Sequence, residues 1–133
     1  MELEIYRGDF TVIMGSSGAG KSTLLYMLSG GEAQRCAMVR ALINDPDVVF
    51  ADEPTGALNS AGVSSVLNVL TDINNSGQSV VMVTHDIKSA RRGNRIIYLK
   101  DGRIEGELRL PRYVSGDKVR HAKVKDFLED MGW

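Results

Sequence analysis

The chain has 133 residues, of which 43% are hydrophobic and 25% are charged, with a formal net charge of −1 at pH 7. This composition excludes a disordered chain, a collagen-like repeat and a coiled-coil rod, and the length suffices for one compact domain but not for two. The longest apolar runs, such as residues 80–83, are far shorter than the roughly 18 residues of a membrane-spanning helix. Because the first residues do not resemble a secretory signal, we expect a cytosolic protein.

The small net charge conceals an asymmetry along the chain. Residues 1–86 hold 4 Lys and Arg against 10 Asp and Glu, whereas residues 87–133 hold 12 against 7. A basic segment can bind lipid, nucleic acid or an acidic partner, but here bases alternate with acids, which favours a solvated surface. We therefore expect no nucleic-acid partner. The single Cys36 excludes an internal disulfide, and with only two histidines it cannot complete a structural zinc site.

Three short apolar runs, at residues 10–14, 48–51 and 79–84, predict strands. Each run is continuous rather than alternating, which is typical of strands covered on both faces in a parallel α/β sheet. A helix is expected after Asn59 and Ser60, since apolar residues follow at helical spacing before the sequence Asn-Asn-Ser-Gly at 74–77. Residues 96–108 predict a β-hairpin that turns at Asp101-Gly102. A last helix is expected at about residues 117–131, with Val124, Phe127, Leu128 and Met131 on its buried side.

Directly after the first predicted strand, residues 15–23 match the pattern G-x-x-x-x-G-K-[ST] between a strand and a helix. The glycines let successive backbone N–H groups converge on an anion, and the helix directs the positive end of its dipole to the same point. Lys21 supplies a charge for the outer phosphates, and Ser22 offers a hydroxyl to Mg²⁺. We therefore predict a site for a nucleoside triphosphate formed by Gly15, Ser16, Ser17, Gly18, Ala19, Gly20, Lys21, Ser22 and Thr23.

Two further strand ends carry polar residues. Residues 48–53 form an apolar strand that ends in Asp52 and Glu53, and ligands of open α/β sheets bind at such carboxyl ends. Asp52 can hold Mg²⁺ through its water shell, and Glu53 can polarise the attacking water. The third strand ends in Thr84-His85-Asp86, where the His85 imidazole could reach the γ-phosphate or the water.

With these residues, the segment Leu-Ser-Gly-Gly-Glu-Ala-Gln-Arg at 28–35 makes the chain resemble the ATP-binding subunit of ABC transporters. The resemblance implies that this signature closes over the ATP of a second subunit, so that Ser29, Gly30 and Gly31 contact the partner's γ-phosphate. It also implies that Glu53 is the general base and His85 the switch histidine. Asn59 would lie in the loop at 56–59 that crosses the dimer axis, where the family usually has Asp.

The resemblance implies a P-loop NTPase-like fold, a three-layer α/β/α arrangement around a mainly parallel sheet, in a single domain over residues 1–133. It also implies ATP and Mg²⁺ as ligands, a homodimer or pseudo-dimer through the ATP sites, and a membrane-spanning permease subunit as partner. The protein would then lie in the cytoplasm on the inner face of the plasma membrane. The segments at 51–58 and 127–133 look most like exporters of antimicrobial peptides, macrolides or lipoproteins.

The chain departs from the family between the phosphate loop and the signature. Family members carry a strand, a glutamine loop and a helical subdomain there, whereas Lys21 and Ser29 are only eight residues apart, a helical span of about 12 Å. Three origins remain open: an internal deletion in the gene, a deliberately shortened chain, or a break in a longer chain whose residues are numbered consecutively. We expect a seam near residues 28–30, and ATP binding with weak or absent hydrolysis.

Two other functions remain open at this point. A soluble ABC-type ATPase of DNA repair or translation would tolerate the basic tail, and it would bind nucleic acid in a salt-sensitive manner. A non-functional remnant would gain no stability from Mg-ATP.

Overall fold

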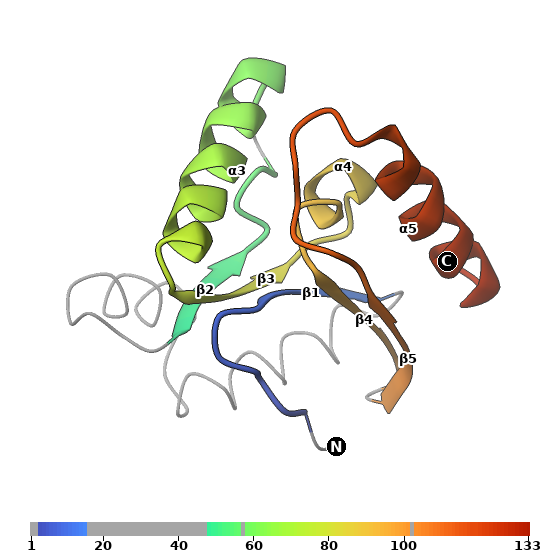
Figure 1. Cartoon of the computed structure of the whole chain (residues 1–133). Helices are drawn as coiled ribbons and strands as arrows, with labels where there is room; N and C mark the ends of the chain where they lie inside the picture. Colours follow the sequence, from blue (N-terminus) through green and yellow to red (C-terminus); the bar gives the residue numbers. More distant parts are fainter. Residues whose placement is uncertain (1–2, 16–47, 57, 102) are drawn as a thin grey trace.

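Five strands form one sheet with the order β2-β3-β1-β4-β5 (Figure 1). The computed structural model describes residues 3–15, 48–56, 58–101 and 103–133. The strands are β1 (Phe10–Gly15), β2 (Val48–Asp52), β3 (Ser79–Val83), β4 (Arg95–Lys100) and β5 (Arg103–Arg109). The pairs β2–β3, β3–β1 and β1–β4 are parallel, and β5 joins β4 as an antiparallel hairpin. The predicted α/β class, the mainly parallel sheet and the hairpin are confirmed.

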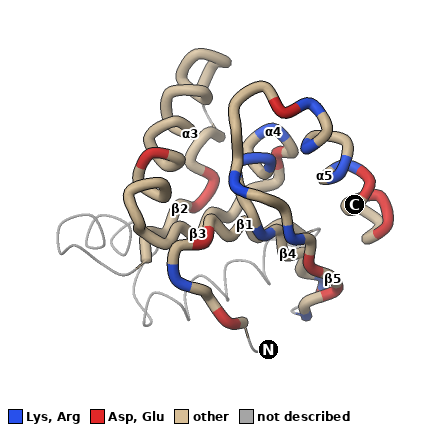
Figure 2. The backbone as a smooth tube through the Cα atoms, in the orientation of Figure 1, with Lys and Arg blue, Asp and Glu red and all other residues tan. Residues whose placement is uncertain are grey.

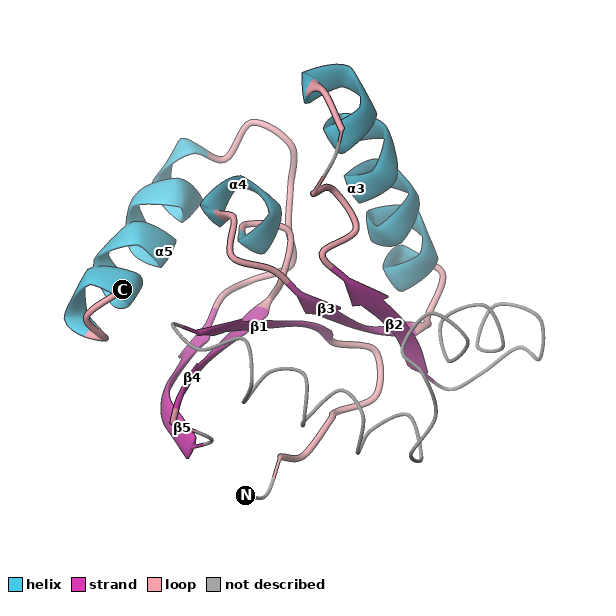
Figure 3. Cartoon of the chain, turned by 180° about the vertical axis from the view of Figure 1, so that it is seen from behind, coloured by secondary structure: helices cyan, strands magenta, loops and turns pink. Residues whose placement is uncertain are grey.

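Three helices lie on one face of this sheet, as the view from behind shows (Figure 3). They are α3 (Ser60–Asn75), α4 (Ile87–Ala90) and α5 (Lys118–Asp130). α3 connects the parallel neighbours β2 and β3, which confirms the predicted βαβ unit. The predicted start is also confirmed, because the side chain of Asn59 caps α3 by accepting a hydrogen bond from the backbone N–H of Gly62 at 2.9 Å. The single turn of α4 was not predicted.

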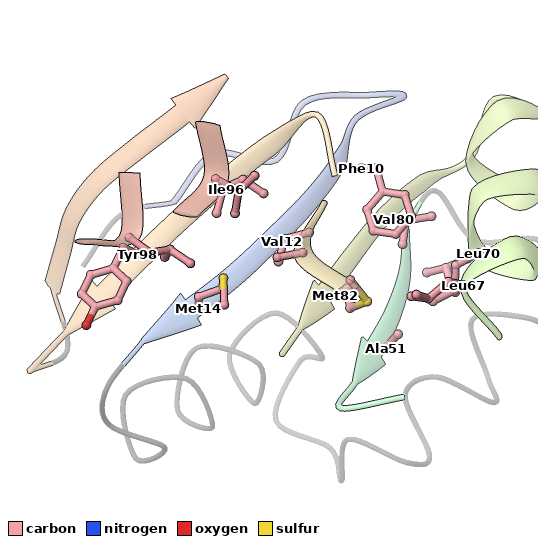
Figure 4. Packing of buried hydrophobic residues seen from close by; sticks show 14 residues of the cluster. Phe10, Val12, Met14, Ala51, Leu67, Leu70, Val80, Met82, Ile96 and Tyr98 are labelled. Carbon is pink, nitrogen blue, oxygen red and sulfur yellow. The ribbon is translucent and has the colours of Figure 1, made fainter. Parts of the chain in front are cut away.

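The main core lies between the sheet and the three helices. Alternate residues of the strands point to this face, among them Val12 and Met14 from β1 and Met82 from β3 (Figure 4). Leu67 and Leu70 of α3 are 3% and 2% exposed, and Val124 and Leu128 of α5 are fully buried. Phe127 and Met131 pack against this core but stay partly exposed. Of the four side chains predicted to be buried here, Val124 and Leu128 are therefore fully buried and the other two are not.

The opposite face of the sheet has a second, smaller core. Its buried members are the other alternate residues of the central strands, and Leu3 and Ile5 of the N-terminal segment pack against them. Apolar contacts on both faces explain why the strands read as continuous apolar runs instead of alternating ones. The second cluster comprises Ile13, Val81, Val83, Ile97 and Leu99. The helix expected between Lys21 and Ser29, on which the three-layer prediction depends, lies outside the described residues.

A buried arginine attaches α5 to the rest of the domain. Arg120 is only 2% exposed, and its guanidinium donates hydrogen bonds to the backbone carbonyl oxygens of Arg91, Gly93 and Pro111. Burial lowers the pKa of Arg120 from its ordinary value, because desolvation disfavours the charged form. The sequence analysis did not identify this residue as part of the interior. The other charged residues of α5 are basic in its first part and acidic at its end, as Figure 2 shows.

None of the helices in the described part of the chain is both long and apolar enough to cross a membrane.

Candidate functional site

The carboxyl ends of three parallel strands meet at one edge of the sheet. Asp52, the last residue of β2, is in register with Val83 of β3, and Val83 is in register with Ile13 of β1. β1 continues to Gly15, after which the predicted phosphate loop begins. The acidic pair and the start of that loop are therefore at the same edge of the sheet.

Gly15 has a packing role that the sequence analysis did not foresee. A Cβ atom at this position would lie 2.4 Å from the backbone carbonyl oxygen of Leu99, the residue in register with it on β4. A side chain of any size would therefore push β1 away from β4, whatever the following loop binds. The requirement for glycine here comes from the sheet as well as from the expected turn.

The structure brings Glu53 and His85 together. The Nδ1 atom of His85 lies 2.7 Å from the Oε1 atom of Glu53, within hydrogen-bond distance. The side chain of His85 is 71% exposed and that of Glu53 is 31% exposed, so both are accessible from the solvent. Since an ionised carboxylate only accepts, Nδ1 carries the proton and the neutral ring keeps a lone pair on Nε2. While Nδ1 donates to Glu53, Nε2 can donate to an anion only if the ring carries a proton on both nitrogens, as in the imidazolium.

The backbone holds the two loops that carry these side chains. The N–H of Glu53 donates to the carbonyl oxygen of Val83 at 2.7 Å, and the N–H of Thr84 donates to the carbonyl oxygen of Ile13 at 3.1 Å. Thr84 is completely buried. Each residue after a strand is thus bonded to the neighbouring strand, which fixes where Glu53 and His85 leave the sheet.

Glu53 adopts a left-handed backbone conformation with φ of 47°. A residue with a Cβ atom is strained in this region by roughly 1–2 kcal/mol, and such strain is concentrated at functional sites. The turn that follows includes a hydrogen bond from the N–H of Gly56 to the carbonyl oxygen of Glu53 at 3.2 Å. The turn therefore stabilises an unfavourable conformation at the residue predicted to act as the base.

This strain predicts an inverted order of stability at position 53. We expect Glu53→Gly to have a higher free energy of unfolding than Glu53→Ala by about 1 kcal/mol, because only glycine adopts φ of 47° without strain. Urea denaturation measures the difference. The matched control is Ser64, an exposed residue inside α3, where the alanine variant should be the more stable by about 1 kcal/mol. If the alanine variant were the more stable one at position 53 as well as at position 64, the backbone strain at Glu53 would be contradicted.

The described residues contain no group of three or more His, Cys, Asp or Glu side chains that could hold a metal ion. Mg²⁺ does not require such a group, because it keeps several water ligands and binds through one or two carboxylates and the phosphates of a substrate. The exposed carboxylate of Asp52 at the sheet edge suits this kind of binding.

Several predicted site residues lie outside the described residues. These are Ser16, Ser17, Gly18, Ala19, Gly20, Lys21, Ser22, Thr23, Ser29, Gly30 and Gly31. Asn59 is described, and its side chain caps α3. The roles assigned to all of these residues, and to Asp52, Glu53 and His85, stay predictions.

The hydrogen bonds of three polar residues near the site were not predicted. Asp86 caps α4, accepting hydrogen bonds from the backbone N–H groups of Lys88 and Ser89 and from the hydroxyl of Ser89. The Ser89 hydroxyl also lies 3.2 Å from that of Thr55. Asp86 carried a signal that was available in the sequence, since Asp before a short helical stretch is a preferred cap. The contact between Ser89 and Thr55 had no such signal in the sequence, because it joins segments that are distant in the chain.

Comparison with known proteins identifies what this arrangement resembles. The family model described as ABC transporter matches the chain in two overlapping pieces, residues 1–30 and 25–56. The pieces overlap next to the seam expected at residues 28–30. Two separate matches that meet there are what a segment missing from the middle of the family's domain produces.

Relatives with curated descriptions match parts of the chain. The uncharacterized ABC transporter ATP-binding protein MJ0796 of Methanocaldococcus jannaschii is 54% identical over 84 residues, which are 62% of this chain and 36% of that protein. The lipoprotein-releasing system ATP-binding protein LolD of Aquifex aeolicus is 44% identical over 102 residues, 77% of this chain and 46% of that protein. The macrolide export ATP-binding/permease protein MacB of Hyphomonas neptunium is 49% identical over 77 residues, 58% of this chain and 12% of that protein. The chain thus spans less than half the length of these relatives.

Solved structures match the fold. The dimeric structure of MJ0796, described as a bacterial ABC transporter cassette, aligns with a TM-score of 0.70 at 26% sequence identity, covering 84% of this chain and 89% of that one. A post-hydrolysis state of the same cassette, bound to ADP and Pi, aligns with a TM-score of 0.71. A nucleotide-free ATP-binding cassette from an ABC transporter aligns with a TM-score of 0.75 at 13% identity, and this match supports the fold alone.

Proposed function

The chain belongs to the ATP-binding proteins of ABC transporters, and from this premise we propose that it is a shortened energy-supplying subunit of an exporter. The observation that carries the proposal is the contact between Glu53 and His85, 2.7 Å apart at the sheet edge where β1 ends. The two residue types that the chemistry needs beside the outer phosphates come from different strands and meet at this edge. The descriptions of LolD as lipoprotein-releasing and of MacB as a macrolide exporter support the exporter class.

In the proposed reaction the protein binds ATP through the backbone N–H groups of residues 15–23 and through Lys21. Ser22 and Asp52 would hold Mg²⁺, which offsets the charge of the phosphates. Glu53 accepts the proton of the attacking water, and His85 orients this carboxylate through Nδ1 and faces the γ-phosphate. Because Oε1 of Glu53 contacts His85, Oε2 would be the oxygen that faces the water.

The proposed assembly places two such chains, or this chain and a related one, around two ATP molecules. Ser29, Gly30 and Gly31 of each chain would contact the γ-phosphate bound by the other, with Asn59 near the dimer axis. The dimeric state described for MJ0796 supports this arrangement. A membrane-spanning permease would be the second partner, and it would keep the protein in the cytoplasm on the inner face of the plasma membrane.

We expect this chain to bind Mg-ATP. At about 100 times its Kd the nucleotide should raise the free energy of unfolding by roughly 2.7 kcal/mol. For a domain of this size that corresponds to a rise in Tm of roughly 8–15 °C, measured by thermal denaturation with and without Mg-ATP. Lys21→Ala should abolish the rise, whereas Lys125→Ala, on an exposed position of α5, should retain it. No rise for the unaltered chain would contradict the proposal and favour a non-functional remnant.

Hydrolysis by the isolated chain should be weak or absent. The separation of eight positions between Lys21 and Ser29 leaves little room to place the signature over a partner's nucleotide, and a misplacement of about 1 Å can cost about 100-fold in rate. Release of phosphate measures the turnover. Turnover comparable to that of a full-length cassette, and lost in Glu53→Gln, would show that the shortened chain is competent and that this part of the proposal is wrong.

A further inference from the structure

Two buried hydroxyl groups connect the loop after β2 with helix α4, which follows the loop after β3. The Oγ1 atom of Thr55 lies 3.2 Å from the Oγ atom of Ser89, and the two residues are 8% and 0% exposed. The Ser89 hydroxyl donates to Oδ2 of Asp86 at 2.8 Å. A hydroxyl has a single proton, so Ser89 cannot also donate to Thr55. The hydrogen bonds therefore run in one direction, from Thr55 to Ser89 and from Ser89 to Asp86.

This chain of hydrogen bonds, which we call the Thr55–Ser89–Asp86 chain, ends beside the two residues of the proposed site. Thr55 follows Glu53 by two positions, and Asp86 directly follows His85. Asp86 is fixed further by the backbone N–H groups of Lys88 and Ser89, at 3.2 and 3.3 Å. Any change in the separation of the two loops must therefore stretch the link between Thr55 and Ser89.

The contact between Glu53 and His85 is too weak to fix the distance between the two side chains by itself. The imidazole is 71% exposed, and exposed pairs of this kind contribute little to stability, because water competes for both partners. The Thr55–Ser89–Asp86 chain is shielded from water at Thr55 and Ser89, where losing a partner is more costly than at the surface. The buried link is thus the stronger constraint on how far apart the two loops lie.

We propose that Thr55 and Ser89 are positioning residues that hold Glu53 and His85 at hydrogen-bond distance. They act through the loop backbone and touch neither the nucleotide nor the water. The inference rests on the proposed function for its purpose, but it concerns a contact between two side chains, His85 Nδ1 and Glu53 Oε1. It can therefore be tested separately from ATP binding.

The test uses NMR of the His85 ring nitrogens in the full chain without nucleotide. In the unaltered protein the Nδ1 resonance should be that of a ring hydrogen-bonded through Nδ1, and Glu53→Ala, which removes the acceptor, marks the shifted position. We expect Ser89→Ala and Thr55→Val each to move the resonance toward that position. Thr55→Ser keeps the hydroxyl and should restore the unaltered spectrum. Ser65→Ala is the matched control, because its hydroxyl donates to the carbonyl oxygen of Ala61 on the exposed side of α3.

The outcomes separate the inference from the proposed function. An unchanged His85 resonance in folded Ser89→Ala or Thr55→Val would overturn the inference, even if the protein binds Mg-ATP. A shifted resonance together with rescue by Thr55→Ser supports it, even if thermal denaturation detects no binding. If Ser89→Ala does not fold, the nearly isosteric Thr55→Val and its Thr55→Ser partner decide the result.

Discussion

Replacing Arg120 by alanine is expected to lower the free energy of unfolding by about 4 kcal/mol. The substitution removes the donors to three backbone carbonyl oxygens, those of Arg91, Gly93 and Pro111, and leaves a cavity where the side chain was. Part of the loss is offset because a charged group that burial disfavours is also removed. Urea denaturation measures the change, and the Tm should fall by roughly 10–20 °C.

The control for this prediction is Lys123→Ala on the same helix. Lys123 is exposed, so its replacement should change the free energy of unfolding by no more than about 0.5 kcal/mol. Equal stability of the Arg120 and Lys123 variants would mean that water or neighbouring groups satisfy the three carbonyls, and that α5 does not depend on the arginine.

The second large effect is expected at Gly15. A methyl group there meets the carbonyl oxygen of Leu99 at 2.4 Å, and a backbone atom cannot rotate away as a side chain can. We expect Gly15→Ala to lower the free energy of unfolding by about 3 kcal/mol, as the end of β1 separates from β4. The predicted phosphate loop starts from this displaced end, so the thermal stabilisation by Mg-ATP should also disappear.

Gly56→Ala is the matched control for the Gly15 variant. Its added Cβ would meet no atom nearer than the carbonyl oxygen of Glu53 at 3.5 Å, an ordinary contact, so the free energy of unfolding should change by less than about 1 kcal/mol. A Gly15→Ala protein that unfolds at the same urea concentration as this control would contradict the close packing of β1 on β4.

The regular elements were largely predictable because they are strongly patterned. The runs at residues 10–14 and 48–51 became β1 and β2 with one further residue each, and the asparagine that begins α3 acts through its side chain as expected. Helix α4 was missed because its single turn shows no repeating apolar pattern, and the preceding Asp86 was read only as part of a site. The register shift between Tyr98 and Leu99 is set by pairing with β5 and left no local signal.

Burial of Arg120 could not be inferred from its neighbours. It stands between Val119, which is 62% exposed, and a histidine, in a helix where basic residues usually face water. Its three acceptors belong to a helix end, a turn and a loop, and only the folded chain brings them to one place. The apolar stripe of α5 at Val124 and Leu128, by contrast, follows helical spacing and was predicted.

The candidate site was predictable only where the sheet itself determines it. The carboxyl ends of parallel strands share an edge, so Asp52, Glu53 and His85 could be expected there from their positions after apolar runs. The contact of Glu53 with His85, the left-handed backbone of Glu53 and the Thr55–Ser89–Asp86 chain depend on how the loops turn. Turns of this kind follow from contacts between distant segments, which a single sequence does not reveal.

The sheet order has a consequence for the chain's tolerance of length changes. β1 lies between β3 and β4, so Phe10 pairs with Val80 and Thr11 with Arg95, and its partners come after the seam. Closing a flexible loop costs entropy that grows only with the logarithm of its length, about 0.6 kcal/mol for each doubling. A shorter connection between β1 and β2 therefore removes no pairing partner from β1. The five strands of the described residues can consequently assemble whatever the length of that connection.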